Sequence, residues 1–70
     1  MKRIGEKLRT LRERRGLSVT ELAEMLEVGH GHISRIESSL KRPSSDLILK
    51  IADLFEVSTD QLMRDELELD

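Results

Sequence analysis

The stretch that predicts the fold is LSVTELAEMLEVGHGHISRIE, residues 17–37. Within it, Ser18 is a favoured helix N-cap, and Glu21 lies three residues later, where its carboxylate can accept a hydrogen bond from the Ser18 amide. This capping-box pattern marks the start of a helix. We therefore predict a helix over residues 19–26.

A second short helix is predicted directly after the first. Val28 and Gly29 fall in the connecting turn, and Ile33 and Ile36 then share one face of the segment 30–37. Two short helices joined by a turn of about three or four residues form a helix-turn-helix corner. Many small helical bundles contain such a corner, so the spacing by itself leaves the function open.

Three further helices are predicted outside this stretch. The first ends near Arg15, because Gly16 favours the left-handed conformation that follows many helix ends. Another begins after Pro43, and a short last helix begins at Ser58, where Gln61 repeats the capping-box pattern. The inward positions of these helices are Ile4, Leu8, Leu11, Leu47, Ile48, Ile51, Ala52, Phe55, Leu62 and Met63.

The length and composition of the chain limit what it can be. Its 70 residues suffice for one small domain and leave little room for a deep catalytic cavity. The lack of Cys excludes disulfides and thiolate metal sites and suits a cytoplasmic protein. No apolar run approaches the roughly 20 residues that a membrane helix needs, so no membrane partner is expected. We predict an all-α domain over residues 1–64, followed by an acidic tail, residues 65–70, that is a frayed end or a linker.

Charge is divided unevenly along the chain. The formal net charge is -2, but residues 1–42 hold ten Lys/Arg and six Asp/Glu, whereas residues 43–70 hold two and eight. This separation lets one face attract phosphates while another stays acidic, and solvated helix faces without any partner explain it equally well. Phe55 is the single aromatic residue, so the stacking platforms of single-strand binders are missing and duplex DNA stays possible.

Motifs along most of the chain occur together in one known family. They are IGEKLR at 4–9, RGLS at 15–18, ELA at 21–23, Val28, ISRIE at 33–37, PS at 43–44, LKIA at 49–52 and VS at 57–58. With these motifs the chain resembles the Cro and phage-repressor (XRE) family of helix-turn-helix regulators. The resemblance implies a lambda-repressor-like domain of five helices that binds double-stranded DNA as a transcriptional regulator, more often a repressor.

The resemblance also implies which residues read the bases. The third helix enters the major groove, and the family positions that contact bases fall on His30, Gly31, Ser34 and Arg35. Arg35 can pair with guanine O6 and N7, a contact worth about 1–3 kcal/mol of discrimination. The alternative for Arg35 is a surface ion pair worth roughly 0–1 kcal/mol. Gly31 departs from the family, which more often has a polar side chain at this position.

Contacts to the DNA backbone are expected on both sides of the third helix. Val19 stands where the family often has Gln, so the amides at the start of the preceding helix are expected to hold a phosphate in its place. The expected backbone contacts are Ser18, Val19, His32, Ser39, Lys41 and Arg42. Of these, Lys41 and Arg42 are the principal side-chain contacts to phosphate.

Two further sets of residues are singled out, one by the family pattern and one by the need for selectivity. Arg12 and Glu37 occupy positions of a partly buried structural ion pair, with a phosphate contact by Arg12 as the alternative. A homodimer on a palindromic operator is expected, because one short helix contacts too few bases to be selective. Its predicted interface comprises Phe55, Leu62, Met63 and Leu67, although burial in the domain's own core explains the first three equally well.

Other classes of function are not favoured by the sequence. His30 and His32 are two residues apart and point away from each other on a helix, so no metal site is expected. No cofactor, small-molecule ligand or enzymatic activity is expected either. The rival function is a protein-interaction module, such as an antitoxin or an adaptor, that uses the same fold.

Overall fold

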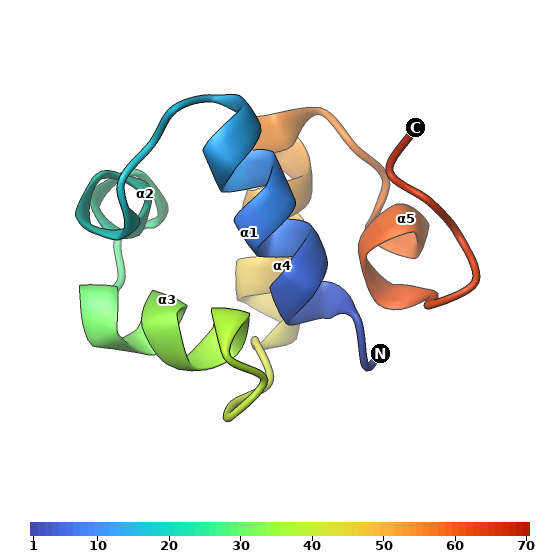
Figure 1. Ribbon diagram of the computed structural model, residues 1–70, viewed down its shortest axis with the longest axis horizontal. Coiled ribbons are helices and arrows are strands. Elements are labelled where there is room, and N and C mark those ends of the chain that lie inside the picture. The colour runs from blue at the N-terminus through green and yellow to red at the C-terminus, as the bar shows by residue number, and fades with distance from the viewer.

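Five helices make up the regular structure of the computed structural model, which describes residues 1–70 (Figure 1). They are α1 (Ile4–Arg14), α2 (Val19–Leu26), α3 (His30–Glu37), α4 (Ser45–Phe55) and α5 (Thr59–Met63). The predicted all-α fold is confirmed, and α2 and α3 have the predicted bounds. None of the helices has the combination of length and apolar character that crossing a membrane requires.

The helix starts are fixed by local hydrogen bonds. The Glu21 amide donates to Ser18 Oγ (3.0 Å), and the Ser18 amide donates to Glu21 Oε1 (2.8 Å). Ser58 and Gln61 form the same reciprocal pair at the start of α5, at 2.9 and 3.0 Å. Both predicted capping boxes are therefore present. By contrast, α3 begins at His30, and its N-cap residue Gly29 provides no side-chain hydrogen bond; α1 also lacks a side-chain cap.

One hydrophobic core joins all five helices. Its 14 buried residues are Ile4, Leu8, Leu11, Leu22, Ala23, Leu26, Ile33, Ile36, Leu47, Ile48, Ile51, Ala52, Phe55 and Leu62. α3 packs against both α2 and α1, and α4 contacts α2 and α5. Ile33 and Ile36 are fully buried, so the opposite face of α3 is turned to solvent.

A close backbone approach sets the position of α3 against α1. At Gly5 a Cβ atom would collide with the Ile36 carbonyl oxygen, which is backbone and cannot swing aside. Glycine is therefore required at this position for α1 to lie against the C-terminal end of α3.

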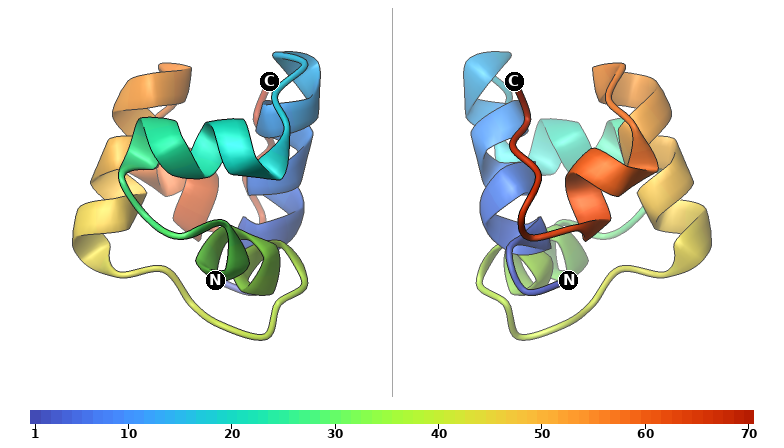
Figure 2. Two further views of the ribbon diagram at one scale, coloured as in Figure 1. Left: turned by 90° about the vertical axis from the view of Figure 1, so that its left-hand side faces the viewer. Right: turned by 90° about the vertical axis from the view of Figure 1, so that its right-hand side faces the viewer.

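Residues 64–70 form a C-terminal strap that runs back along α1 (Figures 1 and 2). The buried Lys7 ammonium donates to the carbonyl oxygens of Gln61 (2.6 Å), Arg64 (2.8 Å) and Leu67 (2.6 Å). Leu69 is half-buried against the core. In the structure the acidic tail is thus held to the domain instead of frayed. The division of the chain at residue 64 stays a prediction.

Candidate nucleic-acid interface

The solvent face of α3 carries the four residues predicted to read bases. His30, Ser34 and Arg35 are exposed, whereas Gly31 is half-buried. His32, predicted as a backbone contact, is also half-buried. Since the core holds the other face of the helix, this surface is the part of α3 that can enter a groove.

Arg35 lies back along its own helix toward Gly31. A Cβ atom at Gly31 would be 3.4 Å from Arg35 Nη1, so the guanidinium rests beside the first turn of α3. Arg35 has no carboxylate within ion-pair distance, so the surface ion pair considered as its alternative role is not formed. Its donors remain available to an external acceptor.

The loop after α3 is anchored by a tight helix end. Ser39 adopts a left-handed conformation (φ 63°), and the amides of Leu40 and Lys41 donate to the Arg35 carbonyl at 2.8 and 3.3 Å. This is the Schellman arrangement, in which the residue two beyond the helix end satisfies one of the last carbonyls. It holds Lys41 and Arg42, both exposed, next to the end of α3.

The start of α2 offers less to a phosphate than the sequence suggests. Ser18 Oγ and its amide are both engaged in the capping box with Glu21. Hydrogen bonds from Ser18, first of all from its backbone amide, lower the pKa of Glu21, so a charged carboxylate lies at this helix end. The amides of Val19 and Thr20 remain without an acceptor in the chain.

Arg12 and Glu37 form an ion pair that joins α1 to the end of α3. Arg12 Nε donates to Glu37 Oε2 (2.8 Å) and Nη2 donates to Oε1 (3.0 Å), while Nη1 donates to the Leu17 carbonyl (2.9 Å). The Arg12 and Glu37 side chains are 13% and 8% exposed. The hydrogen bonds that Arg12 donates to the Glu37 carboxylate are the main reason that the Arg12 pKa is raised. Its donors are directed inward instead of toward an outside phosphate.

The surroundings of all twelve Lys and Arg residues divide them into two groups. Arg3, Arg9, Arg12, Arg14 and Arg64 pair with carboxylates, Lys7 and Lys50 donate to carbonyl oxygens, and Arg15 lies over the Phe55 ring. Only Lys2, Arg35, Lys41 and Arg42 have no such partner.

These four cations belong to the α3 end of the molecule, which comprises α3, the loop 38–44 and residues 1–2 (Figure 2). Both views in Figure 2 place these segments at one end and the C-terminus at the other. Positive charge is therefore left without a partner at the α3 end, where an anionic ligand would neutralise it. The sequence does not single out Lys2, because nothing in its local sequence distinguishes it from Arg3.

The residues predicted for a dimer interface are placed in two different environments. Phe55 and Leu62 are core residues, 6% and 0% exposed, so they are not available to a second copy. Met63 and Leu67 are 40% and 37% exposed. Met63 also lines an apolar hollow between α4 and α5, together with Leu49.

Residues 3–67 match the sequence model of a family described as helix-turn-helix domain. The chain belongs to this family. The helix-turn-helix domain is 35% identical over 60 residues to ImmR of Bacillus subtilis (strain 168), an HTH-type transcriptional regulator, and the match covers 86% of the chain and 47% of ImmR. The chain thus spans about half the length of this curated relative.

Solved structures are similar to the whole helix-turn-helix domain. The N-terminal DNA-binding domain of SinR from Bacillus subtilis has a TM-score of 0.85 and 30% identity, covering 97% of this chain and 100% of that one. The P22 c2 repressor in complex with a synthetic operator has a TM-score of 0.83 and 25% identity, covering 90% and 96%. The resemblance to the Cro and phage-repressor family is confirmed, as is the lambda-repressor-like fold.

Proposed function

We propose that this helix-turn-helix domain binds double-stranded DNA with sequence specificity. We propose further that it acts in the cytoplasm as a transcriptional repressor. The observation that carries the proposal is the distribution of Lys and Arg side chains: those outside the α3 end are paired or engaged, and those at the α3 end have no partner in the chain. The similarity to a repressor solved with an operator supports it.

In the proposed complex α3 lies in the major groove, which is about 12 Å wide and accepts a helix with its side chains. His30, Gly31, Ser34 and Arg35 face the base edges, and Arg35 forms a two-bond contact to guanine. Lys41 and Arg42 bind phosphates beside the groove and orient the domain without reading sequence. The activity proposed is binding, and no chemical step is part of it.

Two copies are proposed to bind one palindromic operator. A single α3 contacts too few base pairs to select one site in a genome, and a symmetric pair doubles the contacts. Half-sites separated by about one helical turn, 34–36 Å, match such a pair. The exposed apolar side chains of Leu49, Met63 and Leu67 are the proposed contact between copies, since Phe55 and Leu62 are already buried.

Selection of bound duplexes from a random pool tests the function directly. A conserved half-site motif, repeated as a palindrome, is the expected result. The selected duplex and a scrambled duplex are then titrated at several salt concentrations, because neutralised phosphates make log affinity fall linearly with log salt. A protein that binds no duplex at low salt, and whose α3 amide signals do not shift, would instead act as a protein-interaction module.

A further inference from the structure

A small hollow lies where the N-terminal residues meet the end of α3. Its rim carries Lys2 from before α1 and Ser39, Lys41 and Arg42 from the loop after α3. No carboxylate is among the residues that line the hollow. Three like charges from two distant parts of the chain repel one another across this hollow, so an anion bound there would be favoured.

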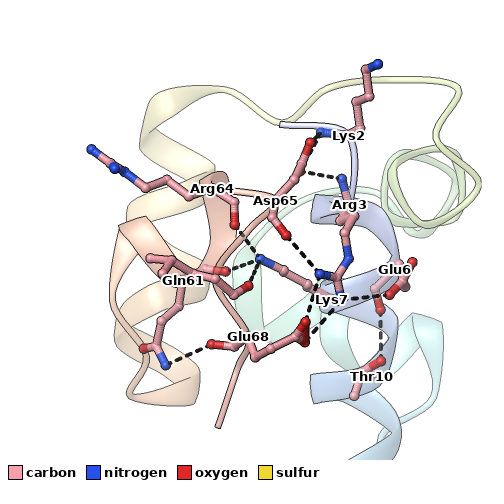
Figure 3. A network of polar contacts seen from close by, with 10 residues as sticks. Lys2, Arg3, Glu6, Lys7, Thr10, Gln61, Arg64, Asp65 and Glu68 are labelled. Atoms are coloured by element: carbon pink, nitrogen blue, oxygen red, sulfur yellow. Dashed lines mark hydrogen bonds and ion pairs between the residues drawn. The ribbon is translucent and has the colours of Figure 1, made fainter.

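The Lys2 side chain is directed away from the polar network behind it (Figure 3). In that network the Asp65 carboxylate accepts hydrogen bonds from the Lys2 amide at 2.8 and 3.0 Å and from the Arg3 amide at 2.9 Å. These contacts hold the backbone of the N-terminal residues, while the Lys2 ammonium has no partner in the chain. A fixed backbone with a free ammonium is suited to binding an outside ligand.

We propose that Lys2 is a further DNA-backbone contact, which binds a phosphodiester of the duplex across the hollow from Lys41 and Arg42. Asp65 is then a positioning residue, because it holds the segment that carries Lys2. The inference rests on the proposed DNA binding and deepens it. It assigns to the C-terminal strap a part in binding, although the strap itself does not touch DNA.

The position of the hollow supports a duplex as the source of the phosphate. Ile36 in the last turn of α3 and Ser39 in the loop that follows belong to its lining, so the hollow adjoins the helix proposed to enter the groove. The backbone of a duplex runs along both sides of the major groove and carries one negative charge per about 1.7 Å of axis. A cation beside the end of α3 therefore adds to the neutralisation by the loop.

The variant Lys2→Gln tests the contact, with Arg14→Gln as the matched control. Arg14 loses the same charge at the other end of α1, where it pairs with Asp70. We expect Lys2→Gln to weaken binding to selected and scrambled duplexes alike, by about three- to tenfold at low salt. The salt slope, which is the slope of log affinity against log salt concentration, should become shallower by about 0.9. Arg14→Gln should leave the slope unchanged. An unchanged slope for Lys2→Gln would overturn the inference.

Asp65→Asn separates a positioning role from a structural one. In the natural background it should weaken duplex binding, whereas added to Lys2→Gln it should cause no further loss, even though thermal unfolding reports the lost hydrogen bonds in both backgrounds. Equal losses of binding in both backgrounds would overturn the positioning role.

Inorganic phosphate, added at constant ionic strength, distinguishes a free-anion site from a duplex contact. The difference in duplex affinity between Lys2→Gln and the natural chain should persist in the presence of phosphate. If it disappeared, the duplex would not be the source of the phosphate that Lys2 binds. If the natural chain binds no duplex, the proposed function itself fails. If it binds and Lys2→Gln binds equally well, only this inference fails.

Discussion

Lys2 and Arg3 are neighbours in the sequence, yet they belong to two contrasting regions. Arg3 donates to Glu6 and Glu68 and faces the C-terminal strap, where Arg3 and Lys7 are engaged by carboxylates or carbonyls (Figure 3). Lys2 belongs to the α3 end, where the Lys and Arg side chains have no partner in the chain, although the Met1 ammonium lies 3.8 Å from Asp65 Oδ2. The comparison indicates how a chain with a net negative charge can keep a positive face. Its acidic residues pair with cations outside the α3 end and leave those of the proposed DNA interface without a partner.

The ion pair between Arg12 and Glu37 joins α1 to the end of α3, and its loss should have the largest effect. Arg12→Ala would leave a Glu37 carboxylate that is only 8% exposed without its partner. We expect the free energy of unfolding to fall by about 3 kcal/mol. Denaturant titration measures this. Arg9→Ala, which breaks an exposed pair with Glu13, is the control and should change stability by less than about 1 kcal/mol.

Gly5 and Gly31 should respond to alanine with opposite signs. Gly5→Ala forces a Cβ against the Ile36 carbonyl and should destabilise the fold by about 1–3 kcal/mol. Gly31→Ala meets only ordinary contact with Arg35 and should stabilise α3 by up to about 1 kcal/mol. Thermal unfolding of both variants checks the pair. A harmless Gly5→Ala would mean that α1 and α3 do not approach as closely as described.

Within the α3 end, replacing Arg35 and replacing Lys41 should change DNA binding in two different ways. Arg35→Ala should cost about 1–3 kcal/mol of binding to the selected duplex and relax the base preference. Lys41→Ala should weaken all duplexes alike and make the salt slope shallower by about 0.9. Competition between selected and scrambled duplexes at two salt concentrations separates the effects. If both variants changed only the salt slope, α3 would not be reading bases.

The smallest effect is expected from the ion pairs of the C-terminal strap. They should make the free energy of unfolding depend on pH in the acidic range. Hydrogen bonds from Arg3 lower the pKa of Asp65 and of Glu68, and those from Arg14 lower the pKa of Asp70. A carboxyl with a lowered pKa stabilises the fold above its unfolded pKa, near 4, and this contribution is lost as the pH falls through the folded value.

We therefore expect unfolding free energy to decline below about pH 4, and to decline less steeply in Glu68→Gln. Unfolding titrations between neutral pH and about pH 2 measure the slope. Equal slopes for Glu68→Gln and the natural chain would show that the pair between Arg3 and Glu68 does not persist in solution.

The helix bounds could be predicted from the sequence because their causes are local. Ser18 and Glu21 are three residues apart, as are Ser58 and Gln61, so each capping box is visible within one turn. The spacing of Ile33 and Ile36 likewise determines which face of α3 is buried, and with it which side chains of α3 can meet a ligand.

The pairing of Lys7 and Arg3 with the C-terminal strap was decided only by the tertiary structure, whereas the pair between Arg12 and Glu37 was expected from the family pattern. Lys7 meets carbonyls 54 to 60 residues away, and Arg3 meets Glu68 across 65 residues. No periodicity or motif relates such distant positions, and the acidic tail gives no local sign of its docking. Charge content and helix faces are thus properties of the sequence. Which charges remain free depends on the fold, because neutralisation requires two groups within a few ångströms of each other.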